Sequence, residues 1–306
     1  MFVAFLAAIL VTFPAENQRL PVTDRTYVIG AAEMNRRERL YLNGVEIDVY
    51  RTGAFLAMAK AQPGTNTLTF TQGANTLVRR FTVAAPPPPG AAKPPPAKPH
   101  DPYADLGIPT NAAFAAKPPP GTPPQAIHVM VDAGHGGSDA GALSPRGMKE
   151  KDFNLLQAKA VEAALRKAGF RVTMTRTDDS FPALYDRPRR AFREKADVFI
   201  SIHHNATGAG GNPREARHST TYASNEKGLA LAKAIQKHVA QAVAPVRDSG
   251  AQIKSLAVCR NPAVPSCLVE VDFINLPEGE EASGDPVRRE RVASAIVLGI
   301  LDWLSS

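Results

Sequence analysis

The chain has few cysteines and almost no tryptophan, with 2 Cys and 1 Trp in 306 residues. Two cysteines alone cannot make a structural zinc site. Cys259 and Cys267 bracket the short segment RNPAVPS. The sequence leaves two alternatives open for this pair: a disulfide that closes the loop, or two buried free thiols.

A run of about 20 apolar residues, long enough to span a bilayer, is also missing. The apolar run at residues 2–13 is shorter and suits the hydrophobic region of a secretory signal peptide, although no Lys or Arg precedes it. We therefore expect residues 1–18 to be a signal peptide or an anchor. The protein is then expected to be exported, to the periplasm or cell envelope.

Clustered positive charge is absent as well. The net charge is +7, but the excess is spread along the chain. A nucleic-acid surface would be clustered and interleaved with aromatic side chains, so we expect no nucleic-acid partner. A dispersed excess is compatible with a polyanionic wall or membrane surface. We expect the protein to be a monomer.

Proline is abundant, but 15 of the 27 prolines fall between residues 86 and 124. Each proline lacks a backbone donor and fixes its own φ, so this stretch cannot form a helix or an internal strand. We predict a Pro-rich linker over residues 85–126. It divides the chain into two ordered parts.

The part before the linker, residues 19–84, consists of short β-prone runs separated by turn signals. Asn43-Gly44 lies between RLYL and VEIDVY and predicts a tight hairpin, and Pro63-Gly64 predicts another turn. We predict a small all-β sandwich, which resembles the immunoglobulin-like accessory modules of bacterial exported enzymes. No chemistry-bearing cluster occurs in it, so a role in spacing, or in contacting the cell wall or a protein, is expected.

After the linker, residues 127–306 alternate between strand and helix patterns. IHVMVDA, FRVTMTR, DVFISIHH, SLAVCR and SCLVEVDFI read as strands, and three amphipathic segments and the C-terminal stretch read as helices. This pattern predicts an α/β domain with a mostly parallel sheet covered by helices on both faces.

Groups suited to metal binding or proton transfer follow three of these strands. His135 follows the first strand, His203 and His204 end DVFISIHH, and Glu270 lies near the end of SCLVEVDFI. Because ligands gather beyond the carboxyl ends of parallel strands, we expect these groups to converge. Glu150 precedes the first helix and is either a metal ligand or one of the solvated charges of KEKD; we expect Asp152 to cap that helix.

Two imidazoles and one carboxylate would leave a fourth zinc position open for water, which is typical of a catalytic site. Such an ion lowers the pKa of the water and polarises a carbonyl oxygen. A second carboxylate must then move the proton, and Glu270 is the candidate. Its alternative is an ordinary salt bridge at a strand end. Alternate strand residues face opposite sides, so only one of His203 and His204 can be the ligand, and geometry alone does not say which.

Four segments, DAGHGGSDAGA, KEKDFNLLQAKAVEAALRKAGFRVTMTRTDD, ADVFISIHHNA and PSCLVEVDFINLPEGE, closely resemble in order and spacing the zinc-dependent N-acetylmuramoyl-L-alanine amidases of the type-3 family. The resemblance covers essentially all of residues 127–306. It implies that His135, Glu150 and His203 bind one zinc ion per catalytic domain and that Glu270 is the general base and acid. His204 is left to pack, to hydrogen-bond or to line the cleft.

The resemblance further implies a hydrolase whose substrate is peptidoglycan, cut between N-acetylmuramic acid and the L-alanine of the stem peptide. Such an activity serves cell-wall remodelling, daughter-cell separation or wall recycling. The segment around Ser219 and Thr221 departs from the family pattern, as does Ala191-Phe192, so substrate contacts are not carried over there. Some members insert a helix that blocks the site. Here we expect the stretch between HHNA and SLAVC to be filled by one loop and one helix, with no room for an inserted one, which predicts an uninhibited site.

Two rival functions remain open from the sequence. One is a zinc peptidase or another amide hydrolase on the same scaffold, and the other is a wall-binding module without activity. The remaining histidines near the site motifs, His128, His218 and His238, are interpreted as packed or solvated side chains.

Overall fold

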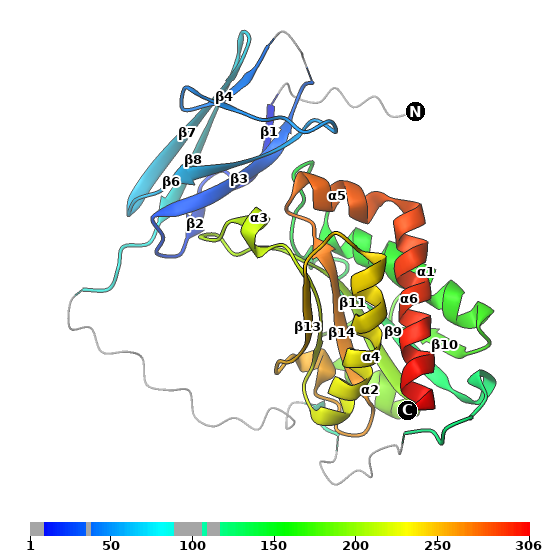
Figure 1. The fold of residues 1–306 in the computed structure, drawn as a ribbon. Coiled ribbons are helices and arrows are strands. Elements are labelled where there is room, and N and C mark those ends of the chain that lie inside the picture. The colour runs from blue at the N-terminus through cyan, green and yellow to red at the C-terminus, as the bar shows by residue number, and fades with distance from the viewer. Residues whose placement is uncertain (1–8, 35–37, 89–105, 109–116) are drawn as a thin grey trace.

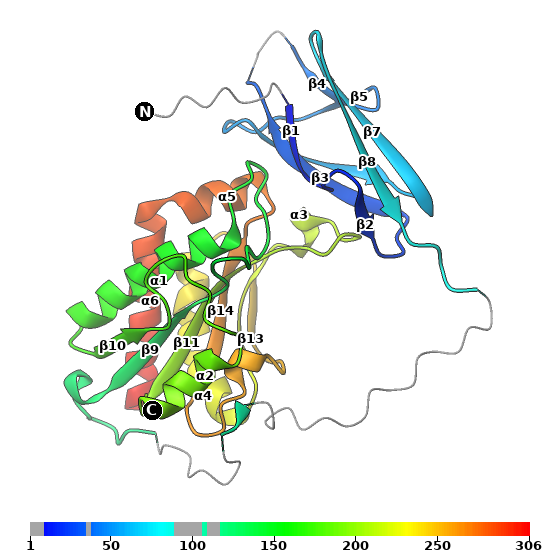
Figure 2. The same ribbon diagram turned by 180° about the vertical axis from the view of Figure 1, so that it is seen from behind.

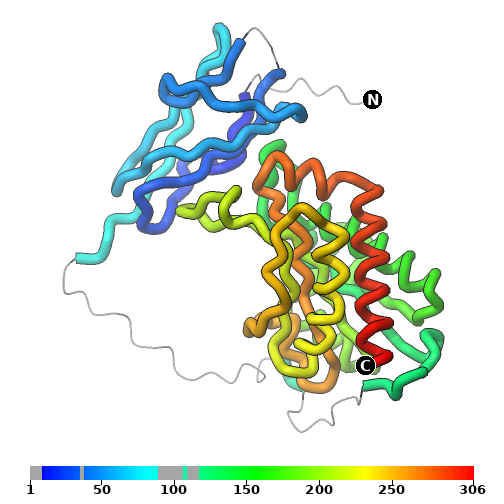
Figure 3. Tube along the Cα trace, in the orientation of Figure 1, coloured from blue at the N-terminus to red at the C-terminus, as the bar shows by residue number. Residues whose placement is uncertain are grey.

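The computed structural model describes residues 9–34, 38–88, 106–108 and 117–306. A strand-rich N-terminal part and a larger α/β part are seen in Figures 1 and 3. Most of the predicted linker, 85–126, lies outside the described residues, so its limits stay predictions. Among the described residues, no helix combines the length and apolarity that crossing a membrane requires.

The N-terminal part, called the β module below, consists of two sheets. The first has the order β1 (Ile9–Phe13), β3 (Arg25–Ala32) and β6 (Ala54–Lys60), and the second has the order β2 (Gln18–Leu20), β8 (Asn75–Val83), β7 (Gly64–Gln72), β4 (Leu40–Leu42) and β5 (Val45–Ile47). Buried apolar side chains of both sheets, among them Val28, Phe55, Phe70 and Phe81, form one core between them. The predicted β-sandwich is confirmed.

The turn at Asn43-Gly44 joins β4 to β5 as predicted. Both residues have positive φ, 49° and 80°, which the turn requires and which Asn and Gly tolerate. The start of the module differs from the expected boundary at residue 19. Residues 9–13 form β1, which pairs antiparallel with β3 and buries Ile9 and Val11. Part of the expected signal segment is therefore built into the module.

The α/β part is organised around a six-stranded sheet. Its order is β10 (Arg171–Met174), β9 (His128–Ala133), β11 (Val198–Asn205), β14 (Ser266–Phe273), β12 (Ser219–Ala223) and β13 (Asp248–Ile253). β10, β9, β11 and β14 run parallel, whereas β12 runs antiparallel to β14 and parallel to β13. The carboxyl ends of β9, β11 and β14 consequently share one edge.

Both faces of this sheet are covered, as predicted. Three helices pack on one face: α1 (Glu150–Lys167), α4 (Glu226–Ala242) and α6 (Pro286–Ser305). They bury the strand side chains Val131, Ile200 and Val269, and this is the larger core. The other face buries Phe199 and Leu268 under α2 (Asp186–Arg193) and the short 3-10 helix η3 (Ala257–Cys259).

Some local predictions are wrong. SLAVCR, expected as a strand, contains η3 instead, because its apolar residues Val258 and Cys259 pack under the sheet as a turn. The region between the histidine strand and the last strand holds more than one loop and one helix: it also contains α3 (Pro213–Ala216), β12 and β13. A short helix, α5 (Pro277–Gly284), follows β14, and the 3-10 helix η2 (Pro124–Ala126) precedes β9. Cys259 and Cys267 are buried free thiols.

The β module lies against the edge of the α/β sheet where α3 and α5 are found, as both views show (Figures 1 and 2). The Tyr50 hydroxyl and the Arg51 guanidinium donate to Glu281 of α5, at 2.9 and 2.8 Å. The Thr12 hydroxyl donates to the carbonyl of Pro145, at 3.3 Å. Ala209, in the loop after β11, packs against the module core. The module therefore contacts loops that leave the predicted catalytic edge.

Candidate metal centre

His135 lies just beyond the end of β9, in a loop whose carbonyls are held by arginine. Arg187 donates to the carbonyls of Ala133 and His135, each at 2.8 Å. The same guanidinium pairs with buried Asp132 at 2.8 Å. His135 has a φ of 60°, a rare conformation for a side chain other than glycine that this network helps to stabilise. Its Nδ1 lies 2.8 Å from Asp139, which orients the ring.

Glu150 is the first residue of α1, so the helix itself presents the carboxylate. Its backbone amide donates to the carbonyl of Ala142, and that of Lys151 donates to Ala140. The expected capping role of Asp152 is wrong: Lys149 is the N-cap, and the loop carbonyls satisfy these first amides in place of a side chain. Oε1 of Glu150 lies 3.2 Å from Nε2 of His135.

The two histidines of β11 point in different directions. His203 faces His135 and Glu150, and its Nδ1 lies 3.0 Å from Oε1 of Glu150. His204 faces the α1 side and is 3% exposed, with its Nδ1 2.9 Å from the side-chain oxygen of Asn154. The alternation of strand side chains thus separates the pair, and His203 is the one beside His135 and Glu150.

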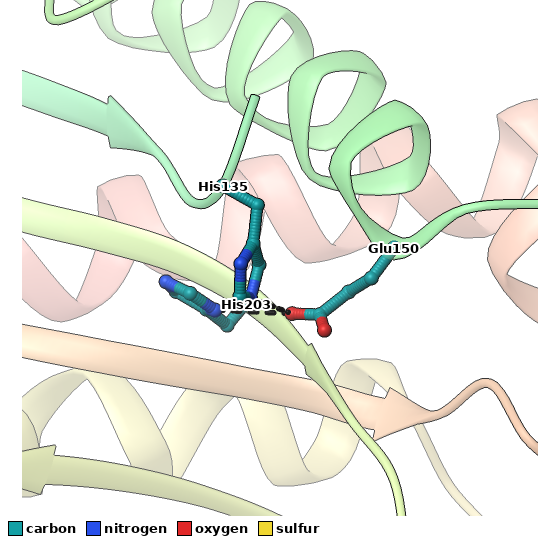
Figure 4. A group of neighbouring side chains, drawn as sticks. All are labelled: His135, Glu150 and His203. Atoms are coloured by element: carbon teal, nitrogen blue, oxygen red, sulfur yellow. Dashed lines mark hydrogen bonds and ion pairs between the residues drawn. The ribbon is translucent and has the colours of Figure 1, made fainter. Parts of the chain in front are cut away.

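Figure 4 shows His135, Glu150 and His203 converging from a loop, a helix and a strand. Each residue offers one ligand atom, and these atoms lie within 4.8 Å of one another. No other group of three or more His, Cys, Asp or Glu side chains with such spacing occurs among the described residues. The three residues named from the sequence are therefore brought together, and they could hold one metal ion. These three side chains are called the metal cluster below.

Two glycines make room for this cluster. A Cβ on Gly134 would lie 2.2 Å from Nε2 of His203, and one on Gly141 would lie 2.6 Å from Oε2 of Glu150. Real Cβ atoms do not approach other atoms so closely. Any larger residue at either position would displace a candidate ligand.

The electrostatics of the cluster favour a cation. Burial by itself raises the pKa of Glu150, but the two histidine rings outweigh it and hold this pKa well below the usual range. Burial also lowers the pKa of His135, yet Glu150 and then Asp139 outweigh it and raise that pKa to about 9. The buried carboxylate is thus kept ionised, and positive charge is stabilised beside it.

Glu270 lies next to the cluster. It pairs in register with His203 across β14 and β11, so both side chains rise from the same face. Burial raises the pKa of Glu270 to about 7, although the charge of His203 opposes the shift. Its Oε2 is buried and hydrogen-bonded to no described residue. A carboxylate with a pKa near neutrality and a free oxygen is suited to exchange protons.

Comparison with known proteins decides the family. Residues 129–302 match the family model described as N-acetylmuramoyl-L-alanine amidase (Amidase_3). The chain belongs to this amidase family. The family resemblance and the α/β fold expected from the sequence are thereby confirmed.

Relatives with printed names support the same placement of this amidase-family chain. It is 32% identical over 206 residues to a probable cell wall amidase, LytH, of Staphylococcus epidermidis, an alignment that covers 67% of the chain and 66% of that protein. It is 32% identical over 220 residues to the N-acetylmuramoyl-L-alanine amidase AmiA of Salmonella typhimurium, covering 57% and 75%. The chain thus spans slightly less than two thirds of the staphylococcal relative.

Solved structures of amidases match the α/β part. The catalytic domain of CwlV, from Bacillus (Paenibacillus) polymyxa var. colistinus, is 34% identical with a TM-score of 0.55, and covers 58% of this chain and 98% of that one. An N-acetylmuramoyl-L-alanine amidase from Clostridium difficile 630 is 33% identical with a TM-score of 0.55, covering 60% and 98%. The match corresponds in size to one whole catalytic domain.

Several residues that support the candidate site were not identified from the sequence. The side-chain nitrogen of Asn154 donates to Glu150 at 3.1 Å, and its oxygen accepts from Nδ1 of His204 at 2.9 Å, so Asn154 links the metal cluster to the second histidine. Its position one helical turn after Glu150 was the available signal. Asp132 and Arg187 carried no such signal, because they are 55 residues apart.

Three further histidines of the described part of the chain contribute nothing to the cluster. His128 is buried with Nε2 2.9 Å from Thr173, His218 lies 2.7 Å from the carbonyl of Ala216, and His238 lies 2.8 Å from Asp302. A cavity of about 270 Å³ opens beside the metal cluster, on the sheet face where α2 and η3 pack. Its lining includes His135, His203, Phe181, Leu184 and Val258. The candidate site is thus open next to the proposed ligands.

Proposed function

We propose that this protein is a zinc-dependent N-acetylmuramoyl-L-alanine amidase that hydrolyses the amide between N-acetylmuramic acid and the L-alanine of the peptidoglycan stem. One observation carries the proposal: the convergence of His135, Glu150 and His203 beside Glu270, in a chain of the amidase family. The substrate bond is taken from the names of the relatives.

The three candidate ligands fit zinc. Two imidazoles and one carboxylate form a donor set that zinc takes in catalytic sites. The set is assembled without a fourth protein ligand among the described residues, and glycines shape the space around it. When bound, zinc supplies a lowered pKa for water and polarisation of the scissile carbonyl.

Glu270 is the proposed proton carrier. Its carboxylate accepts a proton from the attacking water, and the same group then donates that proton to the alanine nitrogen as the amide bond breaks. A pKa near 7 suits both halves of this exchange, because the group gains and loses a proton with little driving force in either direction.

Other side chains hold the ligands in place. Asp139 fixes the ring of His135, and Asn154 fixes the carboxylate of Glu150. His204 positions Asn154 in turn, which gives the second histidine a supporting role and leaves His203 as the ligand.

The setting of this activity is proposed on the same basis. An enzyme that acts on peptidoglycan belongs in the periplasm or cell envelope, where we expect the protein as a monomer, with the β module contacting the wall or another protein. We also expect activity without an activator. Of the α-helices between β11 and β14, α4 packs on the sheet face opposite Glu270, and α3 lies beside the module. The 3-10 helix η3 packs on the face of Glu270, where its Val258 lines the cavity.

Replacing Glu270 by Gln tests the assignment of the base. The variant keeps the shape of the side chain and all three ligands, so zinc should stay bound at one per chain while hydrolysis of purified sacculi falls by about 10²- to 10⁴-fold. Glu290→Gln, on the exposed surface of α6, is the matched control and should leave the rate unchanged. Near-normal hydrolysis by the Glu270 variant would remove Glu270 from the mechanism.

The products separate the proposal from its rivals. An amidase releases intact stem peptides that begin with L-alanine, whereas a peptidase cuts within the peptide and an inactive wall-binding protein releases nothing. Mass spectrometry of digested sacculi distinguishes the three.

A further inference from the structure

A lysine lies near Glu270 on the side away from the histidines. Lys254 directly follows β13, where its backbone amide donates to the carbonyl of Ala223 at 2.8 Å. Its side chain is exposed, and its Nζ lies 4.6 Å from the centre of the Tyr222 ring. No described residue places a carboxylate within ion-pair distance of it. The ammonium is thus held over an aromatic face and still has its charge available.

Strand register places this pair on the face of the sheet that carries Glu270. Thr220 of β12 pairs with Glu270, and Tyr222 pairs with Leu268, so Tyr222 is the diagonal neighbour of Glu270. Diagonal neighbours on one face have Cα atoms about 7–8 Å apart. The charge of Lys254 opposes the rise that burial causes in the pKa of Glu270. The charge of Glu270 adds to burial in raising the pKa of Tyr222. Both effects agree with this proximity.

The sheet order gives the site a direction. Across the sheet, the strands β9, β11, β14, β12 and β13 carry in turn His135, His203, Glu270, Tyr222 and Lys254, within the strand or shortly after it. Because β12 and β13 run opposite to β14, Tyr222 lies level with Leu268 and Lys254 follows the residue level with Ala223, so both lie toward the amino end of β14 from Glu270. The cavity extends from His135 and Asp132, at the end of β9, to Val258 of η3. Because the proton donor must reach the leaving nitrogen, the leaving peptide belongs on the Glu270 side. The sugar then belongs on the His135 side.

The chemistry of the leaving peptide matches what lies there. The residue after L-alanine in a stem peptide is a glutamate joined through its side chain, so its α-carboxyl group is free or amidated. This group is about 6 Å from the alanine nitrogen by ordinary bond lengths. With that nitrogen in hydrogen-bond reach of Glu270, the carboxylate falls in the region over Tyr222.

We propose that Lys254, held over Tyr222, forms a subsite for the α-carboxylate of the second stem-peptide residue, so that the leaving peptide runs from the metal cluster across β14 toward β12 and β13. The subsite rests on the proposed amidase function. The subsite distinguishes stem peptides whose second residue has a free α-carboxylate from those in which it is amidated. The position of the bond that is cut does not depend on the subsite.

The test uses two disaccharide tripeptides that differ only in whether the α-carboxyl of the second residue is free or amidated. The zinc-loaded wild-type protein should show a kcat/KM ratio of about fivefold in favour of the free acid, as expected for one partly exposed ion pair. Lys254→Gln should bring this ratio close to one, and Lys254→Arg should keep most of it. Lys233→Gln, an exposed lysine of α4 on the opposite face, is the control and should keep the full ratio.

A second measurement does not depend on turnover. Calorimetry compares binding of the free tripeptide L-Ala-γ-D-Glu-L-Lys and of its α-amide, and Lys254→Gln should abolish the difference between them. An unchanged preference in Lys254→Gln, or equal treatment of both peptides by the wild type, overturns the subsite. Cleavage at the muramoyl-alanine bond in either case leaves the amidase function intact. Absence of cleavage alone refutes the function, and the binding comparison then decides the subsite.

Discussion

Replacing His203 and His204 one at a time by alanine tests the separation of roles between two adjacent imidazoles. His203 has 15% of its side chain exposed and touches Glu150, whereas His204 is 3% exposed and its ring reaches the cluster only through Asn154. The backbone amide of His204 also donates to Glu150, at 3.4 Å, and an alanine keeps this amide. His204→Ala should therefore cost more unfolding free energy than His203→Ala, and His203→Ala should cost more zinc affinity.

The magnitudes follow from the contacts. His204→Ala empties a buried ring site against Phe153 and leaves the oxygen of Asn154 without its partner, which should cost about 3 to 5 kcal/mol of unfolding free energy. Asn154 keeps its bonds to Glu150 and to the Gly134 carbonyl, so zinc affinity should fall only about tenfold.

His203→Ala removes a ligand and little buried surface. Its stability cost in the metal-free protein should be about 1 kcal/mol. The binding free energy of a four-ligand zinc site is roughly 10 to 16 kcal/mol. If it is shared among the ligands, the loss of one ligand costs about 3 kcal/mol of zinc-binding free energy, which is more than a hundredfold in Kd.

Two assays measure the pair: urea unfolding in the presence of EDTA, and zinc titration against a chromogenic chelator. The expected result is a crossed pattern, in which the more destabilised variant is the better zinc binder. Loss of zinc in His204→Ala with retention in His203→Ala would refute the assignment. Equal losses in both variants would refute the separation of roles.

Two further predictions concern space and charge at the same site. Gly134→Ala should push aside the ring of His203 and weaken zinc binding at least about tenfold, as for loss of a supporting contact, while the control Gly208→Ala, with nothing near its added Cβ, should have no effect in the same titration. In the metal-free protein, Glu270 has a raised pKa of about 7 and burial lowers the pKa of His204 to about 4, so their effects on stability oppose each other between pH 4.5 and 6.5. Glu270→Gln should therefore lose roughly 2 to 3 kcal/mol of unfolding free energy as the pH falls through this window, because the remaining His204 takes up a proton in the unfolded chain before it does so in the folded one. His204→Gln should gain a similar amount, because the remaining Glu270 takes up its proton more readily in the folded chain. Urea unfolding across the window checks both, and slopes of the same sign in the two variants would contradict the assignment.

The placement of the candidate ligands could be predicted because it follows from a general property of parallel sheets. Once strands were recognised ending at His135, His203 and Glu270, their carboxyl ends had to meet at one edge. The alternation of side chains also separated His203 from His204, although choosing between them needed the family pattern.

Other parts of the fold were not predictable from local pattern. β13 reads DSGAQI, which has too little apolar content to indicate a strand, and it forms because β12 offers a parallel edge. SLAVCR has the composition of a strand but is buried as a turn, since packing under Tyr222 and Leu268 satisfies the same apolar residues. Sequence periodicity does not distinguish these two ways of burying a short apolar run.

The supporting network around the metal cluster was also beyond sequence reasoning. Arg187 and Asp132 form a buried pair that fixes the His135 loop, yet each looks like an ordinary charged residue in its own segment. The contacts of Arg51 with Glu281 and of Thr12 with Pro145 join residues more than 100 positions apart. Such pairs become visible only when the chain is folded.

The most direct test of the central claim is metal analysis of the purified protein combined with mass spectrometry of the peptidoglycan it digests. The expected result is one zinc ion per chain and the release of intact stem peptides with a free L-alanine amino group, both abolished by removal of the metal and restored by zinc. Full activity without metal, or cleavage at any other bond of the stem, would contradict the account.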